Sequence, residues 1–240
     1  MFYDRTVEKY IRSVSDTFPV MILTGPRQVG KTTLLTRMAE PGRNYVGLDS
    51  PTNRALAKGD PELFLQRFEP PVIIDEIQYA PELLDHVKIH ADRYKRCGDF
   101  WLTGSQSFVS MKNVSESMAG RIGIVNLLSL SHTEITGSLF GEYETNVETL
   151  ISRQKTSVPM SRNDTFLTIL KGGMPRLYED QPVGLQDYFG SYFHTYLSRD
   201  IKDLAQVADE LAFYKFMRVC GGLATTLVDY TNIEKRWVSL

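Results

Sequence analysis

The sequence predicts an α/β fold: a parallel five-stranded sheet with helices on both faces, followed by a smaller, mostly helical unit. Three observations lead to this prediction. Short apolar runs bounded by proline or glycine recur through the first half of the chain, as is typical of buried strands. Stretches of helical periodicity separate these runs, which favours parallel pairing through crossover helices. After about residue 130 the short apolar runs give way to longer helical patterns.

The elements expected in the first half alternate between helix and strand. A leading helix is expected over residues 7–17, a second over 32–39, and a third from Pro81 to about Arg96. Proline and glycine bound most of the apolar runs between them. The expected strands are Val20–Leu23, Tyr45–Leu48, Val72–Ile74, Phe100–Thr103 and one strand within Ile122–Leu128.

The second half is expected to be helical. Serine, threonine and asparagine cluster near residues 140–160, so we predict one domain over residues 1–145 and a helical region over 146–240. Within that region, an amphipathic helix is expected from Gln186 to about Val207. Another helix is expected from Asp209 to Tyr230.

Composition restricts the classes of partner and compartment. The chain carries 27 Lys and Arg against 29 Asp and Glu, a net charge of −2, so bulk charge does not support non-specific nucleic-acid binding. Its two cysteines, Cys97 and Cys220, have no CxxC spacing, which argues against a disulfide framework or a structural zinc site. No apolar run approaches the length of a membrane span, and the N-terminal sequence lacks the apolar core of a secretory signal. We therefore expect a cytoplasmic protein with no membrane segment.

A phosphate-binding motif (Walker A) lies between the first expected strand and the helix after it. Residues 25–32 read GPRQVGKT and match G-x-x-x-x-G-K-[ST] in full. Gly25 and Gly30 allow positive φ angles, so successive N–H groups can point into one concavity in front of the helix N-terminus. Lys31 is expected to neutralise the β- and γ-phosphates of ATP, and the Thr32 hydroxyl to bind Mg²⁺. The expected nucleotide-binding residues are Gly25, Pro26, Arg27, Gln28, Val29, Gly30, Lys31, Thr32 and Thr33.

Two acidic residues end the third expected strand, in the form of a Walker B motif. The sequence Val72-Ile73-Ile74 is followed directly by Asp75 and Glu76. Asp75 is expected to hold magnesium through water, and Glu76 to orient and deprotonate the attacking water. Because a P-loop kinase needs no water activator beside the metal ligand, Glu76 favours hydrolysis over phosphate transfer to a second substrate.

The motifs GPRQVGKTTL, VIIDEIQ, LTGSQ and MAGRI occur in this order, and GGMPR (172–176) and YFHTYLSRDIKDL (192–204) follow them. Together they resemble a widespread group of prokaryotic AAA-type ATPases, with a P-loop NTPase (AAA-like) fold, over nearly the whole chain. That group carries a C-terminal half of uncharacterised function, often with a winged-helix segment and a nuclease-like domain. The resemblance therefore implies an AAA-type ATP-binding domain over residues 1–145.

The resemblance also implies roles for three residues outside the two motifs. Arg121 takes the place of an arginine finger, which stabilises charge on the γ-phosphate bound to a neighbouring subunit of a homo-oligomer. Capping of the preceding helix or pairing with an acid is the alternative role for Arg121. In the AAA class the fourth strand lies between the P-loop strand and the Walker B strand. Ser105 or Gln106 would then sense or position the lytic water.

The C-terminal region departs from the resembling group, whose members are usually longer. The turn and most of the recognition helix of a winged helix are absent after Tyr230, so we expect the helical region to be the start of a truncated C-terminal domain. Residues 181–240 hold 6 Lys and Arg against 7 Asp and Glu. Since base reading needs a recognition helix in the major groove, we expect no sequence-specific DNA binding by this chain.

Two hypotheses for function follow. The first is a nucleotide-driven switch that hydrolyses ATP slowly and couples hydrolysis to movement of the C-terminal helices. The alternative is a module that holds ATP or ADP without turnover, while its C-terminal helices dock an unidentified protein partner. Glu76 and Arg121 favour the first hypothesis, and the shortened C-terminal region favours the second.

Overall fold

A computed structural model describes residues 2–104, 118–138, 144–156, 159–179, 183–196 and 210–238. The chain forms two compact units, Met1–Leu185 and Gln186–Leu240, which are described separately. The domain boundary expected after residue 145 falls inside the first unit and remains a prediction about domain organisation.

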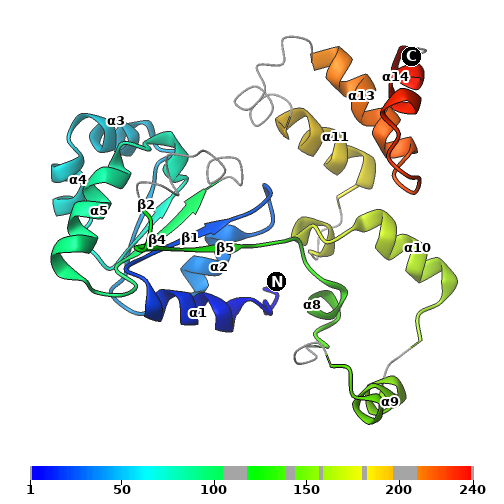
Figure 1. The fold of residues 1–240 in the computed structure, drawn as a ribbon, viewed down its shortest axis with the longest axis horizontal. Coiled ribbons are helices and arrows are strands. Elements are labelled where there is room, and N and C mark those ends of the chain that lie inside the picture. The colour runs from blue at the N-terminus through cyan, green and yellow to red at the C-terminus, as the bar shows by residue number, and fades with distance from the viewer. Residues whose placement is uncertain are drawn as a thin grey trace. The chain divides into compact units, whose positions relative to one another are not determined.

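A five-stranded sheet forms the centre of the first unit, with the strand order β2-β3-β4-β1-β5 (Figure 1). All four strand pairings are parallel. The α/β prediction is therefore confirmed, and β4 lies between β1 and β3 as the AAA resemblance implies. Because the strands are parallel, their carboxyl ends share one edge of the sheet. The strands are β1 (Val20–Thr24), β2 (Asn44–Gly47), β3 (Val72–Asp75), β4 (Phe100–Gly104) and β5 (Ile122–Asn126).

Three helices of the first unit, α1, α2 and α5, occupy the stretches expected to be helical. Two more, α3 and α4, were not predicted. Their signals are local, because Pro51 and Pro61 stand in the first turn of each helix, and the Asp60 side chain caps α4 by accepting from the Leu63 N–H at 2.9 Å. The helices are α1 (Glu8–Thr17), α2 (Lys31–Met38), α3 (Pro51–Gly59), α4 (Pro61–Arg67), α5 (Leu83–Tyr94), α8 (His132–Thr136), α9 (Val147–Thr156) and α10 (Arg162–Lys171), with 3-10 turns η1 (Ile77–Tyr79) and η2 (Pro175–Tyr178).

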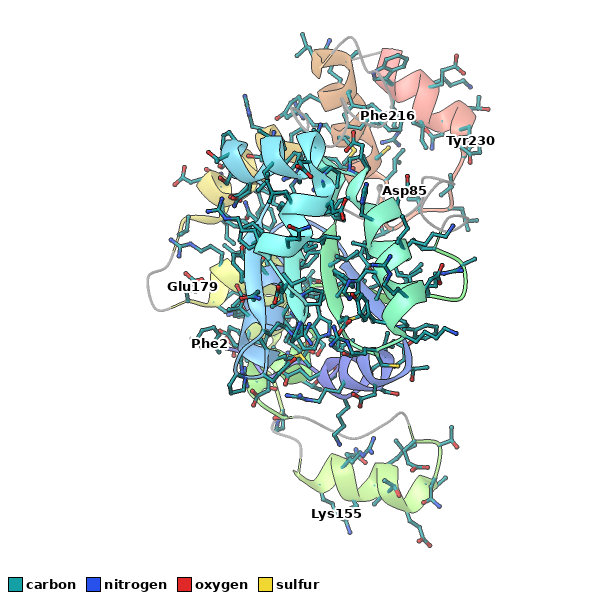
Figure 2. The ribbon with its side chains drawn as sticks, turned by 90° about the vertical axis from the view of Figure 1, so that its left-hand side faces the viewer. Phe2, Asp85, Lys155, Glu179, Phe216 and Tyr230 are labelled. Atoms are coloured by element: carbon teal, nitrogen blue, oxygen red, sulfur yellow. The ribbon has the colours of Figure 1, made fainter. Side chains whose placement is uncertain are left out.

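Two apolar layers cover the two faces of the sheet. Alternate residues of a strand point to opposite faces, so neighbours such as Ile73 and Ile74 belong to different layers. One layer, with Ile74, packs against α3, α4 and α5, and the other, with Ile73, packs against α1 and α2 (Figure 1). Side chains fill the space between the sheet and the helices around α5, on which Asp85 is labelled in Figure 2.

The described part of the second unit is helical and contains α11 (Leu185–Thr195), α13 (Glu210–Gly222) and α14 (Tyr230–Val238). The rings of Phe193 and Tyr214 lie 5.3 Å apart and join α11 to α13. The Trp237 indole N–H donates to the Ala212 carbonyl at 3.2 Å, so α14 packs back on α13. Phe216 on α13 and Tyr230 on α14 are labelled in Figure 2.

One helix expected in this unit is wrong in extent. The helix predicted from Asp209 to Tyr230 ends at Gly222, and α14 begins only at Tyr230. The two consecutive glycines at 221–222 explain the break, because glycine favours helix ends. Of the helix expected over residues 186–207, the part up to Thr195 is helical, and residues 197–207 lie outside the described residues. Across the described ranges, no helix combines the length and apolar character needed to cross a membrane.

Candidate nucleotide site

The loop between β1 and α2 adopts the conformation that its glycines permit. Gly25 has φ 147° and Gly30 has φ 90°, both in the region that favours glycine. A Cβ at position 25 would lie 2.1 Å from the Leu127 carbonyl oxygen, so the close approach also requires glycine. Gly30 is the N-cap of α2, which directs the positive end of that helix toward the loop. The other predicted residues of the motif, Pro26, Arg27, Gln28, Val29 and Thr33, lie in this loop or in the first turn of α2.

Lys31 lies over the loop that it follows. Its ammonium group donates to the carbonyl oxygens of Gly25 and Pro26, each at 2.9 Å. A phosphate oxygen can replace either carbonyl as the acceptor, and because it is anionic it makes the stronger hydrogen bond to the ammonium group. The geometry thus places a positive charge where the motif predicts the β- and γ-phosphates.

Asp75 ends β3 and is the acceptor for three hydroxyl groups. The Thr32 hydroxyl lies 2.9 Å from Oδ1 and 3.0 Å from Oδ2, and the Tyr45 hydroxyl donates to Oδ2 at 3.1 Å. The Thr103 hydroxyl donates to Oδ1 and itself accepts from the Glu76 N–H at 2.9 Å. These bonds satisfy a carboxylate that is only 8% exposed, which a buried charge requires.

Two of these three donors were not predicted from the sequence. Thr103 could have been found, because it follows the inward-facing Trp101 by two residues and therefore faces the α2 side of the sheet with Asp75. Tyr45 gave only a weak signal, a polar group at the second residue of β2. Partial burial raises the pKa of Tyr45, and the carboxylates of Asp75, Asp49 and Glu76 raise it further. Its hydroxyl therefore stays protonated and keeps donating at neutral pH.

The oxygen atoms at this edge suit magnesium, which prefers hard oxygen ligands and keeps several of its waters. Thr32 and Asp75 offer a hydroxyl and a carboxylate within 3.0 Å of each other. The described residues contain no group of three or more His, Cys, Asp or Glu side chains that could hold a metal ion. The Thr32 hydroxyl and the Asp75 carboxylate therefore fit a metal ion that takes its remaining ligands from water and from nucleotide phosphates.

Glu76 follows β3 in the left-handed backbone region, with φ 60° and ψ 50°. Such a conformation costs a non-glycine residue on the order of 1 kcal/mol or more, and it is often found at functional sites. The Gln78 side-chain amide donates to the Glu76 carboxylate and holds it. Glu76 therefore stands at the same edge of the sheet as the loop, Thr32 and Asp75.

Arg121 lies at the other edge of the sheet. It directly precedes β5, whose first residue, Ile122, pairs with Val20 at the start of β1. Its guanidinium pairs with Asp92 on α5 and donates to the Ala119 carbonyl at 2.9 Å. The hydrogen bond from Arg121 lowers the pKa of the Asp92 carboxyl. The structure thus contains the acid pairing that was the alternative for this residue, while Ser105 and Gln106 lie outside the described residues.

A buried arginine that the sequence did not indicate supports the loop from behind. Arg5 is 8% exposed, and its guanidinium donates to the Val29 carbonyl at 3.1 Å and to the Leu128 carbonyl at 2.7 Å. Its Nε lies 3.3 Å from Oε1 of Glu134, which is 5% exposed. Glu134 also accepts from the N–H groups of Thr6 and Ser131, each at 2.8 Å. Arg5 thereby ties the phosphate loop to the segment that follows β5.

This sheet and this loop define a nucleotide-binding P-loop domain of the AAA type. Residues 17–136, half of the chain, match the AAA domain family, and the chain belongs to that family. Residues 162–238 match a domain of unknown function.

The chain is also similar to two curated relatives and to a solved structure. Uncharacterized proteins of Mycobacterium tuberculosis and Mycobacterium bovis are each 35% identical over 122 residues, which cover 50% of this chain and 27% of each relative. The chain thus matches about a quarter of the length of these curated relatives. Among solved structures, the Walker-type ATPase of Pyrococcus abyssi is 13% identical with a TM-score of 0.49, covering 100% of this chain and 89% of that chain.

Proposed function

We propose that this chain binds ATP with magnesium, hydrolyses it slowly, and acts as a nucleotide-driven switch. The observation that carries the proposal is the convergence of the phosphate loop, Thr32, Asp75 and Glu76 at one edge of the sheet. Hydrolysis needs these groups gathered around the bound phosphates, with the attacking water in line with the leaving oxygen.

Each residue has a role in this proposal. Thr32 and Asp75 would hold magnesium, which when bound neutralises charge on the β- and γ-phosphates. Lys31 adds a full positive charge to the same oxygens. Glu76 accepts a proton from water as the water oxygen bonds to the γ-phosphorus. The bond from that phosphorus to the bridging oxygen breaks, so ADP and phosphate leave.

Contacts of the GGMPR segment support the coupling to the C-terminal helices. The Leu130 N–H donates to the Gly173 carbonyl at 2.7 Å, and a Cβ on Gly173 would lie 2.2 Å from the Leu130 carbonyl oxygen. Met174 packs against the apolar layer that contains Val29 of the loop and Leu34 of α2. A shift of the loop on nucleotide binding would therefore reach the segment that leads into the C-terminal region.

The direct test is Lys31→Ala. Because Lys31 supplies a full positive charge within the loop, its loss should weaken ATP binding at least tenfold, or about 1.4 kcal/mol. The melting temperature without nucleotide should barely change, since the two carbonyls that accept from its ammonium group belong to the phosphate loop and not to the apolar layers. Calorimetric titration with ATP measures the affinity, and Lys9→Ala on the exposed side of α1 is the matched control. Unchanged affinity in Lys31→Ala would refute the phosphate site.

We further propose that Arg121 acts only on a neighbouring subunit of a homo-oligomer. Because Ile122 pairs with Val20, Arg121 lies opposite Pro19, directly before β1. Gly25 of the phosphate loop follows Pro19 by six residues along β1, so roughly 20 Å separates Arg121 from the loop of its own subunit. In that case specific activity should rise with protein concentration. Mixing Lys31→Ala protein with Arg121→Ala protein should restore activity, because an intact arginine then meets an intact loop. Activity independent of concentration, with no rescue on mixing, would leave Arg121 as a structural partner of Asp92.

A further inference from the structure

We propose that Tyr45 is a positioning residue for the magnesium-binding carboxylate of Asp75 and, together with Thr103, sets how much magnesium the reaction requires. The inference rests on the proposed function and adds a residue that belongs to neither phosphate motif. Its basis is a hydrogen bond of 3.1 Å from the Tyr45 hydroxyl to Asp75 Oδ2.

The register of β2 on β3 explains how Tyr45 reaches the site. Tyr45 pairs with Ile73 and Gly47 pairs with Asp75, so Tyr45 is the diagonal neighbour of Asp75. Diagonal neighbours across two strands are within reach of an aromatic side chain. The phenol passes close to Gly47, where a Cβ would lie 3.5 Å from the hydroxyl oxygen. A tyrosine two residues before a glycine can therefore extend along the strand to the carboxylate.

The three hydroxyl groups that donate to Asp75 would respond differently to a bound metal ion. Thr32 spans both carboxylate oxygens, but its oxygen is also the predicted metal ligand, so metal binding must change its bond to Asp75. Tyr45 and Thr103 do not share that second role. They donate to different oxygens, Oδ2 and Oδ1, from β2 and β4 on either side of β3. Together they can fix the plane of the carboxylate while Thr32 turns to the metal.

Tyr45 and Thr103 differ in how deeply their side chains are buried. Thr103 is fully buried, and its hydroxyl also accepts from the Glu76 N–H, which links it to the predicted base. Tyr45 is 48% exposed, so replacing it should disturb packing little. Tyr45 is therefore the position at which orientation of Asp75 can be tested apart from folding.

Tyr45→Phe removes only the hydroxyl group. We expect the magnesium concentration for half-maximal ATP hydrolysis to rise about tenfold, as is common when a residue that orients a metal ligand is lost. Affinity for ATP measured in EDTA should stay at the wild-type value, because the phosphate loop is unchanged. Tyr10→Phe, on the exposed face of α1, is the matched control and should leave both quantities unchanged. A merely structural role would move the melting temperature and not the magnesium requirement.

A second variant and a second readout keep the two proposals separable. Thr103→Val removes the hydroxyl group and should also raise the magnesium requirement. Thr103→Ser keeps a hydroxyl group and should show the wild-type magnesium requirement. Calorimetric titration of ATP at several magnesium concentrations gives the same information without turnover. If the wild-type chain shows magnesium-dependent binding and Tyr45→Phe matches it, the inference about Tyr45 is wrong and the proposed function stands. If the wild-type chain shows neither magnesium-dependent binding nor hydrolysis, both proposals fail.

Discussion

Replacing Glu76 with glutamine should leave ATP binding near the wild-type value and reduce hydrolysis on the order of 10²-fold or more. Glutamine is nearly isosteric with glutamate but cannot accept the proton of the attacking water. Thr32 and Asp75 remain in place to hold magnesium, and the left-handed backbone at φ 60° is unaffected by the exchange. Phosphate release under single-turnover conditions measures the rate, and calorimetry measures ATP affinity.

Glu82→Gln is the matched control, because Glu82 is an exposed glutamate before α5 and lies outside the phosphate motifs. A Glu76→Gln protein that hydrolyses ATP at the wild-type rate would show that another group activates water. Wild-type protein that binds ATP but has no turnover would instead favour the non-hydrolysing nucleotide-binding module.

Replacing Arg5 with methionine should destabilise the fold by about 3–5 kcal/mol, the usual cost of leaving one partner of a buried ion pair alone. The substitution removes the ion pair with Glu134 and both hydrogen bonds, to the carbonyls of Val29 and Leu128. Urea unfolding at pH 7 measures the loss, with Arg12→Met on the exposed face of α1 as the control. The double variant with Glu134→Gln should lose less than the sum of the single variants, because the two groups act as a pair. A loss below about 1 kcal/mol in Arg5→Met, typical of a surface pair, would contradict this role.

The same pair predicts a pH dependence. Burial by itself raises the pKa of Glu134, but the N–H groups of Ser131 and Thr6, with the charge of Arg5, lower it to below the ordinary glutamate value. A pKa lowered in the folded state contributes stability above the unfolded value, about 4.3, and that contribution is lost as pH falls through the folded value. The stability difference between wild type and Glu134→Gln should therefore narrow as pH falls below about 4. A difference that stays constant to lower pH would show that ionised Glu134 does not stabilise the fold.

Elements defined by neighbouring residues could be read from the sequence. The strands of the sheet are short apolar runs bounded by turn residues, and the order of β4 between β1 and β3 followed from the AAA resemblance. The phosphate loop could be predicted equally well from the sequence. The positive φ angles of Gly25 and Gly30 and the start of α2 at Lys31 depend on neighbouring residues alone. The helices α3 and α4 were missed although Pro51 and Pro61 marked their starts.

The groups that hold the site in place depend on which strands are neighbours and in which register. Tyr45 donates to Asp75 across 30 positions of the chain, and the Thr6 N–H reaches Glu134 across 128. No local pattern marks such pairs, because a one-residue change of register would turn each strand side chain to the opposite face. The pairing of Arg121 with Asp92 likewise required β5 to start beside α5. The sequence by itself thus determined the phosphate motif and the strands. Tertiary structure decided which distant hydroxyl groups donate to Asp75 and which guanidinium group bonds to the phosphate loop.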